Sequence, residues 1–311
     1  MTTQADPLPL AARLWVYQGE RFPVFKHGLL IAAFASSAVC LSALLSGSQR
    51  FPPWPAFAVA FGVLLTLFLL LRIADEFKDA EVDARYRPER PVPRGLVSLR
   101  ELAGLGVAAA GLQVLLVLGH AAGLLLILAA VWAYLALMTK EFFVPDWLRQ
   151  RPFLYMASHM LIMPLIDLFA TACEWWPAGG PPPGLPCFLA LSFCNGVIIE
   201  IGRKTWAPEM EKEGVESYSS AWGIPRALAA WSLTIGVALA LALLVARQID
   251  FLLPAVCVLG GLAGAMLATA LVFRRQPTVQ ATRRLENLAG LWVFASYLVL
   301  GAVPMGVRTW M

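Results

Sequence analysis

Nine long apolar stretches alternate with polar segments along the chain. Each has close to the roughly 20 residues that a helix needs to cross about 30 Å of hydrocarbon. They lie at 28–46, 54–73, 102–119, 122–139, 153–172, 185–201, 227–246, 250–273 and 287–307. The pattern therefore predicts an all-α, polytopic membrane protein with nine transmembrane helices.

The basic residues between these stretches predict an orientation. Segments 72–100, 140–152, 202–226 and 274–286 hold most of the Lys and Arg, and the segments between them hold few. Because basic loops stay on the cytoplasmic side, we expect these four segments and the N-terminus to be cytoplasmic and the C-terminus to lie outside. Residues 1–27 mix apolar, aromatic and charged side chains, which favours an interfacial segment and not a cleavable signal peptide.

Composition agrees with a membrane protein. The chain is 59% hydrophobic and only 14% charged, and its mean hydropathy is +0.70, which excludes an ordinary soluble domain. The formal charge of +4 does not indicate a nucleic-acid partner, because the basic residues already serve topology. The five cysteines show no metal-site spacing. With no internal repeat visible, we expect one membrane domain over 1–311, in the inner or plasma membrane if the source is bacterial.

The candidate chemistry begins directly after the second apolar stretch. Asp75, Asp79 and Asp83 are four residues apart, so on a helix their carboxylates stack about 6 Å apart along one face. Like charges repel, and hard oxygen ligands of this kind suit Mg²⁺. The alternative is a solvated face balanced by Lys78 and nearby arginines. Their place at the mouth of a membrane bundle favours a functional, catalytic and metal-binding role.

A run of arginines and prolines follows the acids. Arg87, Arg90 and Arg94 alternate with three prolines, and Gly95 closes the run. Prolines stiffen a loop, and guanidinium forks are natural partners of phosphate oxygens. The two features together predict a clamp for a metal diphosphate, to which Arg72 is added as a candidate.

The stretch from Asp75 to Gly95, DEFKDAEVDARYRPERPVPRG, resembles the first signature of the UbiA superfamily of intramembrane prenyltransferases. In that signature an Asn or Asp and two further Asp, four residues apart, precede an RPxRPxPxG tail. The resemblance implies nine helices bundled around a central cavity. It also implies two cytoplasmic active-site loops, here 72–100 and 200–226, which jointly bind two Mg²⁺ ions and an isoprenyl diphosphate.

The second loop departs from the superfamily pattern. The usual aspartates are missing, and Lys204 stands where one is expected. The candidates for the second metal shell are Glu200, Glu209 and Glu213. The alternative is that Glu209, Glu211 and Glu213 are surface charges paired with Lys212. Arg203 and Lys204 are candidate ligands of the diphosphate.

Further candidates come from the helix ends and from buried polar residues. Tyr134 to Lys140 (YLALMTK) resembles the superfamily segment whose lysine reaches the diphosphate, although Glu141 stands where an arginine often follows. The alternative for Lys140 is a cytoplasmic anchor. Asn195 is a candidate for the cavity wall and Trp206 for an aromatic contact with a carbocation. We expect Asp167 to pair with a neighbour and His159 to be a core histidine.

The resemblance implies loss of diphosphate from an allylic substrate to give a carbocation. Capture by an aromatic or other lipophilic acceptor makes the protein a prenyltransferase, and capture by the substrate's own double bond makes it a terpene cyclase. A transporter or non-catalytic lipid binder is the alternative from another class. The charges gather on one side and no repeat is visible, which favours the enzyme. A further alternative is that the protein is an inactive member of the family, which binds diphosphate without turnover.

Overall fold

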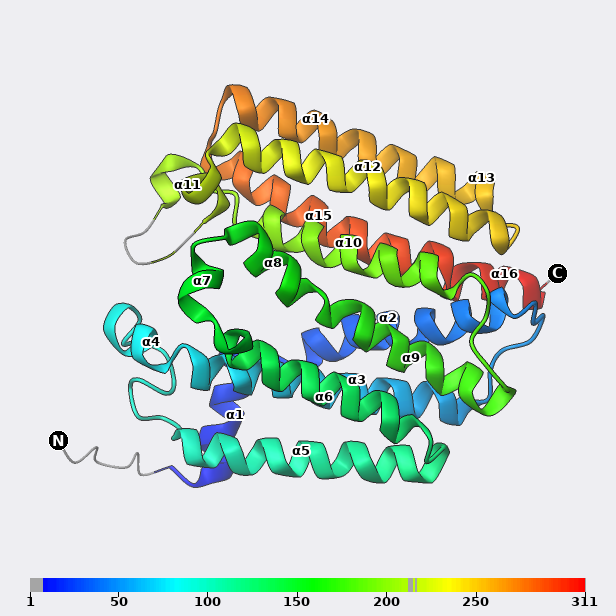
Figure 1. Ribbon diagram of the computed structural model, residues 1–311, viewed down its shortest axis with the longest axis horizontal. Coiled ribbons are helices and arrows are strands. Elements are labelled where there is room, and N and C mark those ends of the chain that lie inside the picture. The colour runs from blue at the N-terminus through cyan, green and yellow to red at the C-terminus, as the bar shows by residue number, and fades with distance from the viewer. Residues whose placement is uncertain (1–7, 212–214, 216, 311) are drawn as a thin grey trace.

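The computed structural model describes residues 8–211, 215 and 217–310, and all regular elements in these residues are helices (Figure 1). Eight spans are long and apolar enough to cross a membrane. Five of these spans in the described residues are single unbroken helices: α2 (Val24–Leu45), α3 (Trp54–Lys78), α5 (Leu99–His120), α10 (Leu185–Arg203) and α12 (Ile224–Gln248). The other three are interrupted: α8 and α9 (Pro152–Met160, Ile162–Ala178), α13 to α14 (Leu252–Ala255, Gly261–Arg275) with a π-helical turn between them, and α15 and α16 (Val279–Leu300, Ala302–Trp310).

A ninth apolar helix, α6 (Leu124–Thr139), has 16 residues, or about 24 Å at 1.5 Å per residue. Helix α1 (Leu10–Arg21) and the C-terminal α16 lie at opposite ends of the bundle (Figure 1), which requires an odd number of crossings. That arrangement supports a crossing by α6, but the count of nine and the side on which the N-terminus lies stay predictions.

The helices pack in successive layers. In Figure 1, α12 and α14 form one outer layer, α10 and α15 lie beneath them, α2, α9 and α3 follow, and α5 forms the opposite edge; α10 contacts both α12 and α15, and α3 contacts α5. Most buried apolar side chains form one large cluster that reaches from Phe22 to Met305, and a second, smaller cluster joins Tyr17 of α1 to Leu102 of α5. The single membrane domain over 1–311 stays a prediction.

Polar groups inside the bundle are satisfied by partners on neighbouring helices. Asp167 of α9 is 3% exposed and accepts hydrogen bonds from the hydroxyls of Ser192 on α10 and Tyr297 on α15. It therefore pairs as expected, and it joins three helices. Polar side chains at this depth are costly unless they are bonded in this way.

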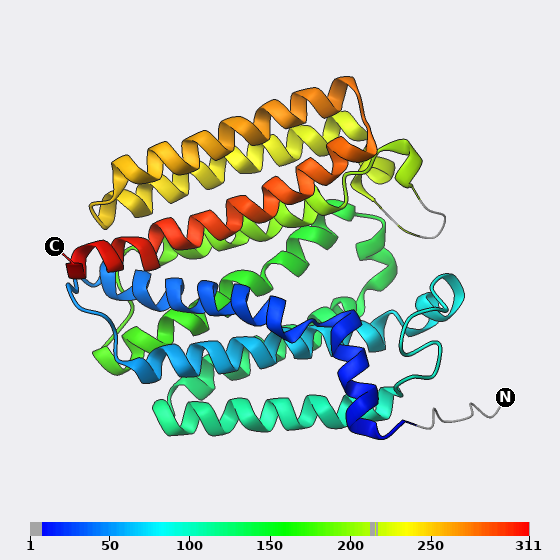
Figure 2. The ribbon, with the colours of Figure 1, turned by 180° about the vertical axis from the view of Figure 1, so that it is seen from behind.

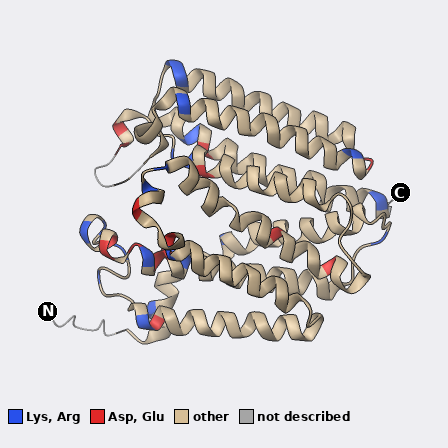
Figure 3. Ribbon diagram, viewed as in Figure 1, with Lys and Arg blue, Asp and Glu red and all other residues tan. Residues whose placement is uncertain are grey.

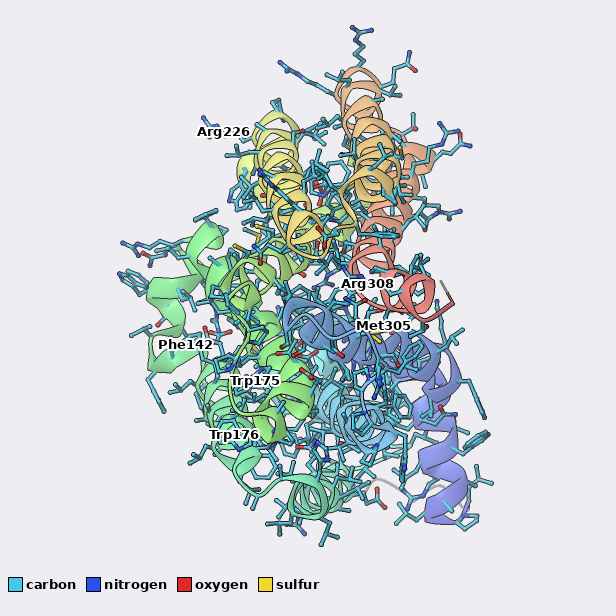
Figure 4. All side chains as sticks on the ribbon, turned by 90° about the vertical axis from the view of Figure 1, so that its right-hand side faces the viewer. Phe142, Trp175, Trp176, Arg226, Met305 and Arg308 are labelled. Carbon is cyan, nitrogen blue, oxygen red and sulfur yellow. The ribbon has the colours of Figure 1, made fainter. Side chains whose placement is uncertain are left out.

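The two ends of the bundle differ in charge. Lys, Arg, Asp and Glu gather at the end that carries three short helices, α4 (Ala80–Tyr86), α7 (Pro145–Arg149) and α11 (Tyr218–Trp222) (Figure 3). Figure 4 looks at the other end, where Arg308 of α16 donates to the carbonyl of Ile249 at 2.5 Å. Trp175 and Trp176 also lie at that end, as tryptophans do at a membrane interface.

Helix α1 crosses the charged end and is tied to the first loop. Its Arg13 bonds both carboxylate oxygens of Glu101, at 3.0 and 2.6 Å, and its Arg21 lies 2.5 Å from the buried carboxylate of Glu76. Figure 2 shows α1 lying across the ends of α3 and α5. The N-terminal segment expected at 1–27 thus contains a helix held by ion pairs.

Candidate active site

The acidic run of the first loop continues the helix that precedes it. Helix α3 ends at Lys78 and α4 begins at Ala80, yet the amide of Asp79 still donates to the carbonyl of Asp75, and that of Asp83 to the carbonyl of Asp79, each at 2.8 Å. The three aspartates therefore keep the four-residue helical spacing that the sequence predicts.

The three carboxylates nevertheless have different surroundings. Asp79 lines a cleft and has no ion pair or side-chain hydrogen bond with any described residue. Asp75 is half exposed, 3.3 Å from Arg72. Asp83 is 2% exposed and is held by Arg87 at 3.1 Å and Arg90 at 2.5 Å. Two of the three predicted metal ligands thus face solvent or the cleft, whereas Asp83 is bound to its own arginine tail.

The arginine tail is folded back on the protein. Arg94 pairs with Glu20 of α1 at 2.7 Å and also donates to the carbonyl of Glu89. Gly95, which ends the tail, has a φ of +79° that side chains rarely adopt. Roles for Arg87, Arg90 and Arg94 at a diphosphate stay predictions, and they require these ion pairs to open.

A cleft of about 560 Å³ opens at the charged end between α3, α4 and the segment from α6 to α8. It is lined by Lys78, Asp79, Val82, Thr139, Lys140, Glu141, Pro145, Arg149 and Tyr155. Lys140, predicted as a diphosphate ligand, is exposed at this cleft. The cleft therefore brings a carboxylate of the first signature together with cations from two other helices. A cavity along the axis of the bundle stays a prediction.

Lys78 is the centre of a polar network in the cleft wall. Its ammonium donates to the hydroxyl of Tyr155 at 2.5 Å and lies 3.1 Å from Glu141. The Tyr155 ring stacks on His159, with ring centroids 4.2 Å apart, and Nε2 of His159 lies 3.3 Å from Lys78. His159, expected in the core, thus contacts the cleft network.

The backbone that presents Glu141 is strained. Glu141, Phe142 and Phe143 have φ angles of 46°, 54° and 60°, in the left-handed region that costs an ordinary residue about 1–2 kcal/mol. The turn places the Glu141 carboxylate against Lys78 and 3.4 Å from Arg149. Three consecutive residues of this kind are typical of a site whose geometry the surrounding fold imposes.

The second loop lies beside the cleft and lines a smaller pocket that adjoins it. Glu200, near the end of α10, is 7% exposed and is contacted by Arg203 at 2.6 Å and Lys204 at 3.0 Å. The hydroxyl of Tyr218 lies 3.4 Å from the same carboxylate. Burial raises the pKa of Tyr218 well above its ordinary value, so the phenol stays protonated and donates.

A smaller pocket of about 40 Å³ adjoins the first and shares two residues with it. It is lined by Arg149, Pro152, Tyr155, Lys204, Ser217, Tyr218 and Ala221. Arg149 and Tyr155 thus connect the first loop to the second. Both loops expected from the sequence, 72–100 and 200–226, contribute to this joined site.

The approach of α10 to its neighbours depends on Gly202. A Cβ at this position would lie 2.9 Å from Cβ of Ala289 and 3.4 Å from Nε1 of Trp231. Only a glycine gives α10 this distance from α12 and α15. Since Arg203 and Lys204 follow directly in the sequence, the close packing at Gly202 also sets the position of these two cationic residues.

Two described residues predicted for the second loop, Glu209 and Trp206, do not line either pocket. Glu209 is exposed on a 3-10 turn, Pro208–Met210, and Glu213 lies outside the described residues. The indole of Trp206 donates to the carbonyl of Arg203 at 2.8 Å. Asn195 is 2% exposed and bonds Trp292 and Ser296 of α15, at 2.9 and 3.1 Å, so its amide joins two helices.

Four cleft residues were not selected from the sequence as site residues: Lys78, Glu141, Arg149 and Tyr155. Lys78 was visible inside the acidic run, but only as a counter-charge. Glu141 was visible as a departure from the superfamily pattern. Arg149 and Tyr155 carry no local signal, because only the packing of α7 and α8 brings them to the first loop.

The donor set can be compared with what Mg²⁺ requires. Among the described residues, no group of three or more His, Cys, Asp or Glu is arranged to hold a metal ion. Mg²⁺ commonly uses only one or two carboxylates and completes its shell with water and substrate phosphate. Asp75 and Asp79, both accessible and four residues apart, fit one such ion.

Comparison with known proteins agrees with this geometry. A sequence model of the UbiA prenyltransferase family matches residues 33–298. A solved digeranylgeranylglyceryl phosphate synthase superposes with a TM-score of 0.65 at 16% identity, covering 96% of this chain and all of that one. The apo structure of a UbiA homolog from Aeropyrum pernix K1 gives 0.65 at 14% identity, covering 91% and 98%. A search of curated proteins found no match.

Proposed function

Because this chain belongs to the UbiA prenyltransferase family, we propose that it transfers a prenyl group from an isoprenyl diphosphate to an aromatic or other lipophilic acceptor within the membrane. The observation that carries the proposal is the cleft at the charged end. There Asp79, which has no partner among the described residues, lines the same cleft as Lys140 and Arg149. We place this end on the cytoplasmic side, since most of the basic segments lie there.

The residues divide between the metal and the anion. Asp75 and Asp79 would hold Mg²⁺, which when bound neutralises charge on the leaving diphosphate. Lys140 and Arg149 are both exposed at the cleft and supply donors for diphosphate oxygens. Tyr155, also in the cleft wall, positions the Lys78 ammonium through its hydroxyl while its ring stacks on His159.

The reaction needs a hydrated, charged site for the diphosphate and an apolar site for the isoprenoid tail. The diphosphate stays at the charged mouth, while the isoprenoid tail extends among apolar side chains of the bundle, where burial of each CH₂ contributes about 0.8 kcal/mol. Ionisation breaks the C–O bond, the diphosphate keeps the electron pair, and a nucleophilic carbon or oxygen of the acceptor then bonds to the cation and releases a proton.

The test is turnover by purified protein in detergent with Mg²⁺, geranyl, farnesyl or geranylgeranyl diphosphate, and a panel of aromatic acceptors. Asp79→Asn removes the accessible carboxylate, so pyrophosphate release should fall by roughly a hundredfold or more. Asp250→Asn is the matched control, because Asp250 is 92% exposed in its side chain at the opposite end and its φ of 51° suits Asn.

Three results are informative. Prenylated acceptor from the wild type and the control, but not from Asp79→Asn, supports the proposal. Cyclic hydrocarbon formed without acceptor would identify a terpene cyclase. Equal activity of Asp79→Asn and wild type, or no turnover with any substrate, contradicts the proposed function.

A further inference from the structure

We propose that the second half of the diphosphate site is cationic: Lys204, with Arg149 and Lys140, does the work of a second metal ion, so that diphosphate binds here with one divalent cation. The inference rests on the proposed function and deepens it. It departs from the two Mg²⁺ ions that the resemblance to the superfamily implies.

The buried carboxylate of the second loop is already neutralised. Glu200 accepts from Arg203 through Nε at 2.6 Å and pairs with Lys204 at 3.0 Å, and the Tyr218 hydroxyl completes its contacts. A divalent ion at Glu200 would sit beside two positive groups, and like charges at about 4 Å repel by about 4 kcal/mol even at an effective dielectric of 20. Glu200 is therefore placed to orient cations.

The other described carboxylates of the second loop do not take the place of Glu200 as ligands of a second metal ion. Glu211 accepts hydrogen bonds from the hydroxyls of Ser217 and Ser219, at 2.7 Å each. Glu209 is exposed on its 3-10 turn. Neither residue lines the cleft or the smaller pocket. In the part of this loop that the structure describes, the side chains that reach the smaller pocket are a lysine, a serine, a tyrosine and an alanine, and none of them is acidic.

The charges that line the two adjoining pockets are those of an anion site. Among the described lining residues, four are cationic and two are acidic: Lys78, Lys140, Arg149 and Lys204 against Asp79 and Glu141. Glu141 is paired with Lys78 and Arg149, which leaves Asp79 to face a metal ion. A site for two divalent ions needs carboxylates in excess, whereas this one suits a single ion shared with an anion.

The placement of Lys204 is fixed by its surroundings. The carbonyl of Lys204 accepts from the amide of Tyr218 at 2.8 Å, and its ammonium lies 5.8 Å from the centre of the Tyr218 ring. Its side chain is 31% exposed, so one face stays open to the smaller pocket. A diphosphate bridging the two pockets would span from Asp79 with its metal ion to this ammonium.

The experiment counts metal ions and measures anion binding without turnover. The full-length protein in detergent is titrated with Mn²⁺ in saturating inorganic pyrophosphate, and bound Mn²⁺ is counted by the loss of the free-ion EPR signal. Pyrophosphate affinity is measured by calorimetry in saturating Mg²⁺. The variants are Asp79→Asn, Lys204→Gln and Lys204→Arg, with Lys26→Gln as control, since Lys26 is exposed and lies in α2, away from both pockets.

We expect the wild type to bind one Mn²⁺ ion per chain. Asp79→Asn should bind no Mn²⁺ ion with the affinity of the wild type. Lys204→Gln should bind pyrophosphate roughly tenfold or more weakly, as loss of a charge-assisted hydrogen bond requires. Lys204→Arg should restore the affinity to within about threefold, because it keeps the charge, and Lys26→Gln should match the wild type.

Two Mn²⁺ per chain, or a Lys204→Gln affinity equal to that of Lys26→Gln, overturns the inference. The proposed function fails separately. If the protein turns over and binds two Mn²⁺ ions, the proposed function is supported and the inference is wrong. If it binds one Mn²⁺ ion and its pyrophosphate binding depends on Lys204, but it does not turn over, the inference is supported and the proposed function is wrong. Absence of pyrophosphate binding in the wild type contradicts both.

Discussion

Glu141, Phe142 and Phe143 form a left-handed turn beside the cleft, and Glu141 pairs with Lys78 of the polar network. Phe142 packs against Tyr134 and His159, with ring centroids 5.6 and 6.1 Å apart. Phe143 is 72% exposed. The turn thus keeps a strained conformation because its first two side chains are held, while the third contributes little to the fold.

Phe143→Gly should raise the stability of the protein. The substitution removes about 1–2 kcal/mol of left-handed strain and costs about 0.5–1 kcal/mol through the greater backbone entropy of the unfolded chain, so the net gain is up to about 1.5 kcal/mol. Thermal unfolding in detergent measures it. Phe153→Gly is the matched control, since Phe153 is 60% exposed in the helix α8, where glycine costs about 1 kcal/mol. A loss of stability in both variants would contradict the explanation by strain.

At the scale of single residues, spacing in the sequence predicts alignment but not partners. The four-residue interval between Asp75, Asp79 and Asp83 correctly places them on continuous helical turns. It cannot show that Asp83 is enclosed by Arg87 and Arg90, because the sequence predicts both the acid and the arginines as ligands of one metal diphosphate and not as partners of each other. Charges of opposite sign a few residues apart satisfy each other when the loop folds back.

Helix α1 is the element whose role differs most from its sequence pattern. Its amphipathic composition predicts a segment at the membrane interface. The structure adds three ion pairs, from Arg13 to Glu101, from Glu20 to Arg94 and from Arg21 to Glu76. Glu101 also caps α5 through Ser98. The first loop and its flanking helices are therefore held from outside by a helix 55 to 88 residues earlier in the chain.

The buried pair of α1 should matter far more than the exposed one. Arg21→Leu leaves Glu76, with a side chain only 1% exposed, without its partner, which we expect to cost about 3–5 kcal/mol of stability. Arg94→Leu removes a pair whose two side chains are 35% and 42% exposed, which should cost at most about 1 kcal/mol. Thermal unfolding in detergent compares the two variants.

The double variant Arg21→Leu with Glu76→Leu provides the control. It replaces both charges with apolar groups and should recover most of the stability. If the single and double variants were equally unstable, the loss would come from packing and not from an unpaired buried charge.

The exposed pair should also respond to pH. A hydrogen bond from Arg94 lowers the pKa of Glu20 below its ordinary value of 4.5. A lowered pKa means that the pair contributes stability above this value, and that the contribution is lost as the pH falls through the folded-state pKa. Glu20→Gln should therefore melt slightly below wild type at about pH 7, and the two should converge as the pH falls below 4.5. A difference that persists at the lowest pH would exclude the titration of Glu20.

For whole elements, the sequence predicted the helices well and their ends less well. All nine apolar stretches are helical, because about 20 apolar residues in hydrocarbon must satisfy their backbone within the segment. Helix α3 runs beyond the predicted 54–73 to Lys78, because its polar end is stabilised by the site. The breaks after Met160 and Leu300 were not predicted, since hydropathy is insensitive to local geometry.

At the scale of the whole molecule, the number of crossings depends on α6, which is shorter than the other spans. Single cysteines at Ala122 and Gln150, placed in a Cys257→Ser background, flank this helix at exposed positions. With a membrane-impermeant thiol reagent, Gln150→Cys should be labelled only from the cytoplasmic side and Ala122→Cys only from the other. Labelling of both from one side would show that α6 does not cross and that the count of nine is wrong.

The overall architecture was predictable because hydropathy and charge act on it directly. Segregation of charge to one end (Figure 3) follows the same alternation of basic loops that the sequence shows. The cleft was not predictable in detail, since Arg149 and Tyr155 reach it from α7 and α8, whose packing has no signature in the sequence.

The ties between α1 and the first loop also set an order of events during synthesis. Arg13 precedes Glu101 by 88 residues, and a ribosome adding roughly 5–20 residues per second needs about 4–18 s to produce that interval. The partner of Arg21, Glu76, follows after 55 residues, so Arg13 is the arginine that remains without its acidic partner for the whole interval. Two apolar spans enter the membrane before the loop that α1 will hold has been translated. The nascent chain therefore completes its first helix early and assembles the entrance of its site only when the third span begins.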